Sequence, residues 1–394
     1  MNILFLSSSY PIFVKGHWQN WSPRHETAKR LVEKGINVFV VAPHTEGAAF
    51  EETIDGVKIY RFGKNAPLDF RRISPFAVPV YMHQFYSKAK KVCGKNKISL
   101  VHGFWAIPSG TIAARIAKEC KIPGIVELLG SDVFLGLKNF LTKGLVKNAI
   151  EKADYVFADG YSLIDFAKSR GIKISRSFVH FYEPEMHDPS KEKILEMRKK
   201  WGIGDNDFVL MVSRFKGKIY GAEYAIRAMP EILKAVPNAK LLLVGKAGDY
   251  EKAIEEEIKK SGAEKNISKT GFLDKQEYWC ALKISDIYIT PSLSDSTSVG
   301  LLEAMFAEKP IIATGIGDNP YWVKNNSNGK IILPADSPEI ARAVIELKNS
   351  DLSKIGAANK KSLEKEHCTW KEIIEKYIEI YETCIKEKQS LGKN

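Results

Sequence analysis

The sequence feature that most constrains the fold is an alternation of short apolar runs with segments of helical periodicity, which occurs twice along the 394 residues. In the first half the apolar runs predict strands at 2–6, 37–42, 57–62, 99–102, 124–129 and 155–158. Helical periodicity predicts helices at 21–33, 81–93, 108–120 and 138–152. Near-continuous apolar strands that alternate with helices are typical of a parallel sheet covered on both faces.

A polar segment at 182–189, which contains two prolines, separates this pattern from its repetition. The second half predicts strands at 208–212, 239–244, 267–270, 287–290, 311–313 and 330–333, with long helices between them. A chain of this length is expected to form more than one domain. We therefore predict an α/β protein with two doubly wound domains, 1–183 and 184–370, whose ligands lie at the carboxyl ends of the strands.

The net charge of +12 is concentrated in the first half of the chain. Residues 1–183 contain 26 Lys and Arg against 15 Asp and Glu, a balance of +11, whereas the remainder contains 33 against 32. A basic field confined to one domain predicts an anionic partner for it. Nucleic acid is not expected as that partner, because the sequence has no recognisable binding module and no interleaving of aromatic and basic residues.

The five cysteines, at 93, 120, 280, 368 and 384, are scattered and form no CxxC pair. This spacing argues against a disulfide framework and a structural zinc site, so we expect no metal and a reducing compartment. The N-terminal segment lacks the features of a signal peptide, and no apolar run approaches the roughly 18 residues that span a bilayer. We therefore expect a cytoplasmic protein.

One segment of the second half combines an anion site with two carboxylates. A predicted strand ends at Pro291, hydroxyl side chains at 296–298 offer helix N-cap oxygens, and a helix is predicted over 299–308. The free amides and the dipole at that helix N-terminus attract anions. Asp295 precedes this site, and Glu303 lies about one turn inside the helix. The layout suits a nucleotide diphosphate-sugar, with amides for phosphate and carboxylates for ribose and sugar hydroxyls.

The acidic pair Asp295 and Glu303, separated by seven residues and followed by Ala-Met, resembles the signature of family 4 glycosyltransferases, which have the GT-B fold. The similarity extends from Gly271 to Gly329. It departs from the common signature in two places, because Asp295 replaces a Glu and the Ser-Thr-Ser at 296–298 replaces Gly-Phe-Gly.

The resemblance implies donor-binding roles for the residues around this helix start. Glu303 would accept hydrogen bonds from the ribose hydroxyls, and Asp295 would accept them from the transferred sugar. The residues that would offer amides and hydroxyls to the diphosphate are Thr297, Ser298, Val299 and Gly300. The competing interpretations are a solvated carboxylate for Glu303, which its apolar neighbours argue against, an Asx turn for Asp295, and an ordinary helix cap for the others.

A basic loop follows the first strand of the second half and resembles the family's Arg and Lys-Gly segment, which neutralises the leaving diphosphate. Arg214 matches the family's arginine. Alignment back from Gly221 places Tyr220 where the family has its lysine, so Lys218 or Lys216 would have to take that role. The alternative is a solvated basic loop.

Two glycine-containing loops also resemble family elements. Gly271-Phe272 resembles the loop that reads the nucleotide base through backbone groups, although a turn at a strand end favours glycine in any case. Gly16, in the loop at 10–18, resembles the glycine that approaches the donor phosphate, with an ordinary structural loop as the alternative.

Two segments of the first half, 101–110 and 129–133, resemble the acceptor-domain signatures of the family. Phe104 and Leu129 stand where the family commonly has histidines, and the second of those histidines usually contacts the transferred sugar. Asp132 remains as a polar group directed toward the cleft, or as an acid near a helix N-cap.

The predicted helix at 81–97 carries an apolar stripe beside five lysines and is preceded by Arg71 and Arg72. It is either a helix with a core-facing stripe and a solvated basic face, or a helix on an anionic membrane surface. The family often glycosylates lipid-linked acceptors, which supports the second interpretation.

The resemblance implies a GT-B architecture of two Rossmann-like domains facing a cleft. The N-terminal domain would bind the acceptor, the C-terminal domain would bind the donor, and the final helix, expected at 371–386 within 371–394, would pack back on the N-terminal domain. It implies a retaining, metal-independent glycosyltransferase of the hexosyltransferase type, without a cofactor, that acts on a glycan or lipid-linked acceptor in polysaccharide or glycolipid synthesis. The residues implied in catalysis are Arg214, Lys218, Asp295 and Asp132. The alternatives are a catalytically silent scaffold and a nucleotide-sugar epimerase.

Overall fold

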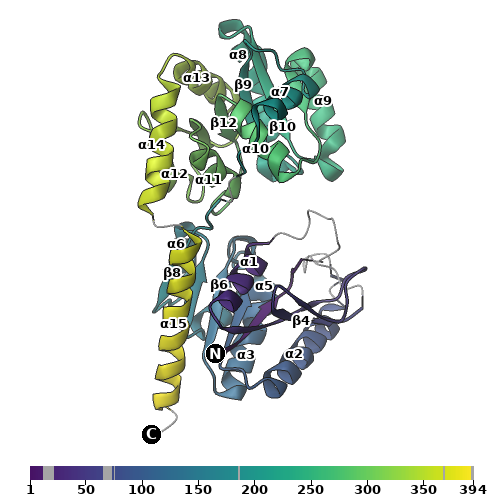
Figure 1. The fold of residues 1–394 in the computed structure, drawn as a ribbon, viewed down its shortest axis with the longest axis vertical. Helices are drawn as coiled ribbons and strands as arrows, with labels where there is room; N and C mark the ends of the chain where they lie inside the picture. Colours follow the sequence, from purple (N-terminus) through teal and green to yellow (C-terminus); the bar gives the residue numbers. More distant parts are fainter. Residues whose placement is uncertain (12–21, 65–72, 75, 185–186, 367–368, 392–394) are drawn as a thin grey trace. The chain divides into compact units, whose positions relative to one another are not determined.

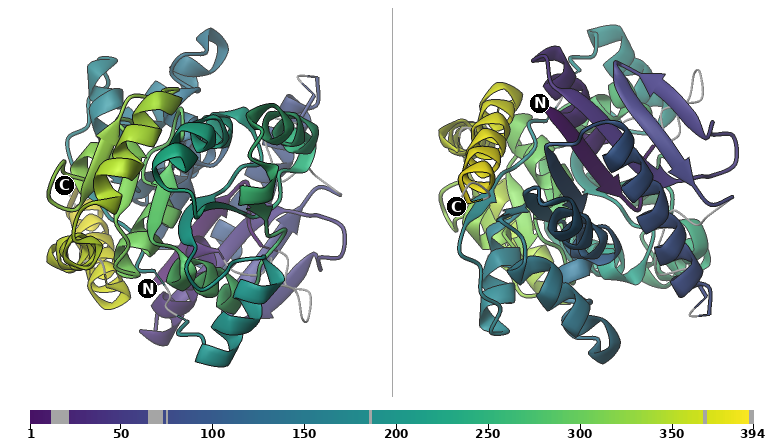
Figure 2. Two further views of the ribbon diagram at one scale, coloured as in Figure 1. Left: turned by 90° about the horizontal axis from the view of Figure 1, so that it is seen from above. Right: turned by 90° about the horizontal axis from the view of Figure 1, so that it is seen from below.

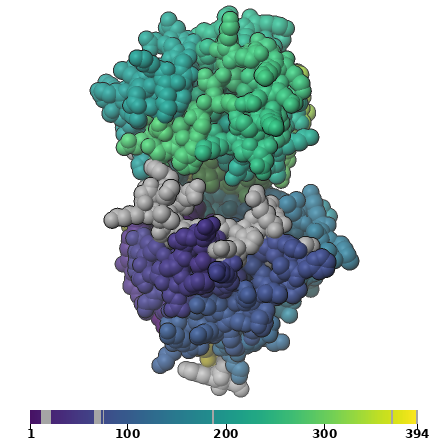
Figure 3. Space-filling model, turned by 90° about the vertical axis from the view of Figure 1, so that its right-hand side faces the viewer, coloured from purple at the N-terminus to yellow at the C-terminus, as the bar shows by residue number. Residues whose placement is uncertain are grey.

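The computed structural model describes residues 1–11, 22–64, 73–74, 76–184, 187–366 and 369–391 (Figure 1). The chain forms two compact units. One contains Met1–Tyr182 together with Thr369–Asn394, and the other contains Glu183–Cys368. In the space-filling view the surface of the first unit is purple to blue and that of the second is teal to green (Figure 3). No helix in the described part of the chain is long and apolar enough to cross a membrane.

The N-terminal unit is built on an eight-stranded sheet with the order β3-β4-β2-β1-β5-β6-β7-β8. Its strands are β1 (Asn2–Ser7), β2 (Asn37–Pro43), β3 (Glu51–Ile54), β4 (Val57–Phe62), β5 (Leu100–Phe104), β6 (Gly124–Leu128), β7 (Tyr155–Ala158) and β8 (Ser177–Val179). All neighbouring strands are parallel except β3 and β4, which are antiparallel. Asp55 and Gly56, both with positive φ, form the two-residue turn between them.

Helices cover both faces of this sheet because its central strands are apolar on both faces. Ile3 and Phe5 of β1 pack with α1 and α15 on one face, while Leu4 and Leu6 pack with α2 and α3 on the other (Figure 2). The helical segments of the unit are α1 (Pro23–Glu33), α2 (Val78–Lys95), the short turn η3 (Ala106–Gly110), α3 (Thr111–Cys120), α4 (Ser131–Phe134), α5 (Phe140–Glu151), α6 (Tyr161–Ser169) and α15 (Trp370–Leu391).

The apolar stripe of α2 is part of the protein core. Phe85 and Ala89 are fully buried against the sheet. On the outer face Lys88 pairs with Glu51 at 3.0 Å, and Lys90 pairs with an acidic residue of α3 at 2.7 Å. The helix α2 therefore has a core-facing apolar stripe and a basic outer face, as in the first of the two interpretations given for residues 81–97.

The C-terminal unit contains a parallel six-stranded sheet with the order β11-β10-β9-β12-β13-β14. Its strands are β9 (Phe208–Ser213), β10 (Ala239–Val244), β11 (Ile267–Lys269), β12 (Ile287–Thr290), β13 (Ile311–Thr314) and β14 (Gly329–Ile332). Its helical segments are α7 (Lys191–Lys200), η4 (Lys218–Tyr220), α8 (Ala222–Ala235), η5 (Gly248–Tyr250), α9 (Glu251–Ser261), η6 (Glu264–Asn266), α10 (Lys275–Ile284), α11 (Val299–Phe306), α12 (Asn319–Trp322), α13 (Ser337–Lys348) and α14 (Leu352–Lys365).

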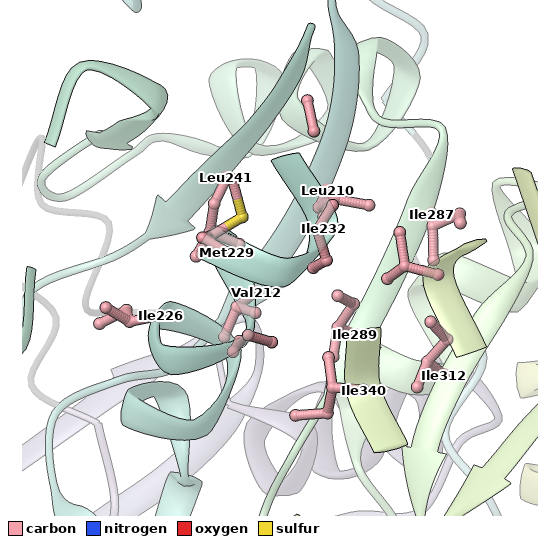
Figure 4. Packing of buried hydrophobic residues seen from close by; sticks show 14 of the residues in the cluster. Leu210, Val212, Ile226, Met229, Ile232, Leu241, Ile287, Ile289, Ile312 and Ile340 are labelled. Carbon is pink, nitrogen blue, oxygen red and sulfur yellow. The ribbon is translucent and has the colours of Figure 1, made fainter. Parts of the chain in front are cut away.

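One core of this unit lies between the sheet and the helices α8, α9 and α13. Leu210 and Val212 of β9 meet Met229 and Ile232 of α8, and Ile340 of α13 completes this layer (Figure 4). α10 and α11 contact the sheet strands β9, β10, β12 and β13. The predicted α/β class with two parallel sheets is confirmed, and every predicted strand is present to within two residues.

Several elements differ from the sequence predictions, and the helix α6 is among those not expected. Strands β3 and β8 were not expected, because β3 is largely polar and β8 has only three residues. The helix predicted at 299–308 ends at Phe306, since Glu308 has a positive φ and Pro310 follows. The final helix is longer than expected and spans Trp370–Leu391.

A buried polar network joins α15 to the sheet. Glu127 of β6 is fully buried, and its carboxylate accepts hydrogen bonds of 2.9 Å from the hydroxyls of Tyr377 on α15 and Tyr182. His102 Nε2 lies 3.3 Å from the same carboxylate, and His102 Nδ1 is 2.7 Å from the Tyr381 hydroxyl. Burial alone would raise the pKa of Glu127, but these partners outweigh it and hold the pKa below its usual value.

We expect Glu127→Gln to lower the free energy of unfolding by about 3 kcal/mol near neutral pH, because an amide cannot replace the buried charge that its partners surround. The depressed pKa means that this contribution is complete above the ordinary value of 4.5 and is lost as pH falls through the folded value. Urea unfolding at several pH values measures both effects. Glu379→Gln on the exposed side of α15 is the matched control, and an equal loss in both variants would contradict this role.

Candidate functional site

The candidate donor site lies where the strand order of the C-terminal sheet reverses. β9 is flanked by β10 on one side and by β12 on the other, so the chain leaves β9 and β12 in opposite directions across the sheet. Ligands of doubly wound sheets bind in the crevice at such a point, outside the carboxyl ends of the strands. Arg214 follows β9 and Asp295 follows β12, so their side chains belong to this crevice.

Arg214 connects these two loops. Its Nη2 donates to Asp295 Oδ2 at 2.7 Å and to Ser298 Oγ at 2.6 Å. Its guanidinium lies over the ring of Tyr220, 5.2 Å from the ring centroid. Burial would lower the pKa of Arg214, but the charge of Asp295 outweighs it and raises the pKa, so the side chain stays a cation. Tyr220, which stands where the family has its lysine, therefore packs its ring against the guanidinium of Arg214.

Asp295 is held by its own loop as well as by the arginine. Its Oδ1 accepts a hydrogen bond of 3.0 Å from the backbone amide of Ser296, the next residue, whereas the Asx turn considered above would accept from the amide two residues on. The loop is supported by Thr297, whose hydroxyl donates to Asp318 Oδ2 at 2.8 Å. A Cβ at Gly317 would lie only 2.3 Å from the carbonyl oxygen of Asp295, so this close approach needs glycine.

The N-terminus of α11 opens into the same crevice. Ser298 is the N-cap, and its side-chain oxygen accepts from the amide of Leu301 at 3.4 Å. Val299 is exposed at the helix start. Gly300 is packed so closely that a Cβ would lie 2.4 Å from the Tyr288 hydroxyl. The amides of Leu301 and Leu302 already bond Ser298, which leaves those of Val299 and Gly300, near the Arg214 cation, for an anion.

Glu303 lies on α11 in a cluster of hydroxyl groups. Burial raises the pKa of its carboxyl to about 7, against a hydrogen bond with Tyr278 and the charges of Arg214 and Lys275, which lower it. Tyr278 of α10 also interacts with Ser213, whose hydroxyl is 2.5 Å from that of Tyr288. Glu303 is partly exposed, and a carboxyl with this pKa changes its charge near neutral pH.

The other predicted donor residues are more peripheral. Gly271, with φ of 71°, forms an isolated bridge with Gly245 beyond the ends of β10 and β11. The side chain of Phe272 is more than half exposed. Lys218 is an exposed residue of the turn η4. Among the described residues, its side chain forms no ion pair with Asp295. Gly16 lies outside the described residues.

The N-terminal unit contains a pocket of about 940 Å³ at the carboxyl ends of β1, β5 and β6. Asp132 lines it, and its Oδ2 accepts a hydrogen bond of 2.7 Å from the amide of Ala106. Its Oδ1 accepts from the amide of Leu129 at 3.3 Å. Burial raises the pKa of Asp132 to about 6, although these amides lower it. Asp132 therefore both lines the pocket and fixes the loops that form it.

The residues that replace the family's histidines have different surroundings. Phe104 is fully buried, stacks on His102 with ring centroids 4.6 Å apart and belongs to the core. Leu129 is partly buried and packs against the same core. Trp105, the next residue after β5, lines the pocket with a positive φ of 68°. His102, part of the acceptor-domain signature, serves the buried Glu127 network instead.

Sequence reasoning missed the hydroxyl groups around Glu303. Tyr278 lies 25 residues before Glu303, on a different helix, and no local pattern connects them. Ser213 is adjacent to Arg214 at the end of β9, so the rule for carboxyl ends of strands could have identified it. The supporting role of Gly317 and Asp318 likewise depends on the pairing of β12 with β13.

Comparison with known proteins agrees with this architecture. A family model described as Glycosyl transferases group 1 matches residues 193–362, and one described as Glycosyl transferase 4-like matches residues 2–160. The N-acetyl-alpha-D-glucosaminyl L-malate synthase of Bacillus anthracis is 25% identical over 373 residues, which are 93% of this chain and 94% of that protein.

Two solved structures share the fold. The sucrose-phosphate synthase of Thermosynechococcus elongatus has a TM-score of 0.79 at 16% identity, over 97% of this chain and 98% of that chain. HepE of Anabaena, solved in complex with UDP-glucose, has a TM-score of 0.72 at 17% identity over 100% of both chains. Since the two family models account for most of both units and these folds extend over the whole length, the chain belongs to the family 4 glycosyltransferases with the GT-B fold.

Proposed function

We propose that the protein transfers a sugar from a nucleotide diphosphate-sugar to an acceptor hydroxyl, with retention of the anomeric configuration and without a metal ion. The observation that carries the proposal is the guanidinium of Arg214, fixed by Asp295 and Ser298 beside the N-terminus of α11. A fixed cation next to free helix amides is suited to a diphosphate. The C-terminal unit is thus the proposed donor domain.

The donor's parts are matched to different residues. The diphosphate lies between Arg214 and the amides at the start of α11, with the hydroxyls of Thr297 and Ser298 close by. Glu303 accepts hydrogen bonds from the ribose hydroxyls, for which an ionised carboxylate is the strong acceptor. Asp295 exchanges its contact with Arg214 for the hydroxyls of the transferred sugar. The backbone around Gly271 contacts the base.

Positive charge that the protein places beside the diphosphate favours the reaction. The bond between the anomeric carbon and the diphosphate oxygen breaks, and Arg214 and the α11 dipole stabilise the negative charge that develops on the leaving group. Lys218 adds charge if its turn closes on the phosphates. The acceptor hydroxyl attacks from the same face and gives its proton to the departing diphosphate. The protein supplies charge and positioning in place of a nucleophile.

The donor is proposed to be a UDP-sugar. A solved protein with the same fold binds UDP-glucose, and a relative over nearly the whole chain transfers an N-acetylglucosaminyl group according to its name. The acceptor is proposed to be a glycan or a lipid-linked sugar in cell-surface polysaccharide or glycolipid synthesis. The basic balance of residues 1–183 favours a cytoplasmic protein that works at an anionic membrane surface.

We expect UDP to stabilise the wild-type protein more than Glu303→Ala. A ligand at about 100 times its dissociation constant adds roughly 2.7 kcal/mol to stability, which thermal unfolding detects. Loss of charge-assisted hydrogen bonds should weaken binding by roughly 10- to 100-fold. Glu308→Gln, on the exposed turn after the same helix, is the control and should bind UDP normally. Equal stabilisation of all three proteins by UDP would remove Glu303 from the donor site, and stabilisation by GDP or ADP alone would change the donor base.

We expect UDP-glucose binding to strengthen as pH rises through the pKa of Glu303, about 7, since the ribose hydroxyls need the ionised carboxylate. A single carboxyl with this pKa predicts roughly tenfold weaker binding one unit below it than one unit above it. Isothermal titration calorimetry across this pH range measures the effect, because the diphosphate diester itself does not titrate there. Glu303→Gln should bind weakly with no such pH dependence, and the same slope in that variant would assign the effect to another group.

We expect Arg214→Lys to reduce kcat by roughly 100-fold or more, because one ammonium cannot replace the guanidinium that contacts both Asp295 and Ser298. UDP affinity should fall much less. The measurement is release of UDP from UDP-sugars with and without acceptor sugars. Lys246→Arg, in the loop after β10, is the control for a charge-preserving change in the same unit. If wild type releases no UDP with any donor and acceptor, the scaffold alternative replaces the enzyme.

A further inference from the structure

The pocket of the N-terminal unit has walls of two kinds. Polar groups that follow the strands form one wall, where Ser8 and Ser9 come after β1 and Asp132 comes after β6. The ring of Trp105 lies on the same edge of the sheet. Because β1 and β5 are the neighbours at which the strand order reverses, this wall occupies the position where doubly wound domains bind ligands.

The remaining lining comes largely from helices and is mainly apolar, although it also includes Thr111, Asn139 and Thr142. Val78 and Met82 belong to the first turns of α2, and Leu141 and Leu145 to the first turns of α5. Ile107 of η3 adds to the same wall. Such a surface gains free energy mainly by covering apolar groups of a ligand, since the Thr142 hydroxyl already donates to the Gly136 carbonyl oxygen and Asn139 Oδ1 already accepts from the Leu141 amide.

The charge of the pocket argues against a small anionic acceptor. Asp132 is the one charged residue among the described lining residues, which include no lysine or arginine. A dicarboxylic acid such as the L-malate named for the Bacillus anthracis relative would face this carboxyl with no cation among the described lining residues, and Arg24, 4.6 Å from the centroid of the Trp105 ring, lies behind that lining. The described lining of the pocket thus favours an uncharged ligand over a dianion.

Apolar side chains continue from the pocket onto the surface. Phe140 of α5 is 87% exposed, Leu141 is 74% exposed and Leu145 is 48% exposed, although the two leucines also line the pocket. Phe76 and Val80, at the start of α2, are 94% and 57% exposed. Single exposed apolar residues are ordinary, but a group that rims an apolar pocket marks a binding surface.

We propose that the acceptor is an amphiphile, with its hydroxyl-bearing head against Ser8, Ser9 and Asp132 and its hydrocarbon chain along α2 and α5. This inference rests on the proposed function and names the acceptor class within it. A polar wall at the sheet edge and an apolar wall that opens onto exposed leucines match a head and a chain in one molecule. An uncharged head fits a pocket whose one described charged side chain is an aspartate.

Alkyl β-D-glucosides below their micelle concentrations test the proposal, with methyl, butyl, hexyl and octyl chains as the probes. Isothermal titration calorimetry gives the affinity of the wild-type protein for each. Burial of one methylene contributes about 0.8 kcal/mol, so affinity should rise about fourfold per added methylene until the chain leaves the pocket. The glucose head is the same in every probe, so the rise of affinity with chain length measures the contribution of the alkyl chain alone.

Variants identify the wall that binds the chain. Leu141→Lys and Leu145→Lys place a charge on this wall at exposed positions, where folding tolerates polar groups. Each variant should reduce the gain in affinity from butyl to octyl glucoside at least tenfold. Leu195→Lys, at a 61% exposed leucine of α7 in the other unit, is the matched control and should keep the wild-type slope. Thermal unfolding without ligand monitors folding in all three.

The two proposals fail separately. Equal affinity for methyl and octyl glucoside, or an unchanged slope in Leu141→Lys and Leu145→Lys, overturns the amphiphilic acceptor even if UDP binds as expected. A steep slope that both leucine variants abolish supports it, and it does so whether or not UDP stabilises the protein. Absence of UDP binding with a steep slope would overturn the proposed transfer reaction and leave an apolar ligand site.

Discussion

The proposed donor site depends on the ion pair and hydrogen bond that Arg214 makes with Asp295 and Ser298. These residues come from loops about 80 residues apart, which meet only because β9 and β12 are parallel neighbours. The same arginine fixes the N-cap of α11, so the position of the helix amides and the position of the cation are determined together. An anion that binds here meets a preformed charge arrangement, which reduces the reorganisation that binding and catalysis require.

Much of the fold could be predicted because the strands are short, apolar and separated by amphipathic helices. In the two halves, which begin with β1 and β9, strands alternate with helices, and few folds other than doubly wound α/β folds have this pattern. β3 was missed because Glu51, Glu52 and Thr53 have low apolar content at a sheet edge, although Asp55-Gly56 is a strong hairpin signal. Edge strands satisfy their backbone through one neighbour and need no apolar sequence, so hydrophobic periodicity does not detect them.

The site residues could be predicted from the sequence only in part. The meeting of Arg214 with the α11 N-terminus follows from strand order and motif spacing, both of which the sequence contains. The hydroxyl cluster around Glu303 does not, since Tyr278 reaches it through helix packing that no local pattern encodes. For the same reason, His102 and Phe104 looked like parts of an acceptor signature, yet the structure uses one in a buried hydrogen-bond network and the other in the core.

The packing of α15 on the N-terminal sheet has a consequence for synthesis of the chain. Ile373, Ile374 and Tyr377 of this helix complete a core whose other members lie between residues 3 and 182, while residues 183–368 form the other unit. In topological terms the C-terminal unit is an insertion within the N-terminal unit. A growing chain must therefore hold the N-terminal sheet with part of one face, beside α1, uncovered until the whole C-terminal unit has been translated, and that part is the one most open to aggregation or chaperone capture in the interval.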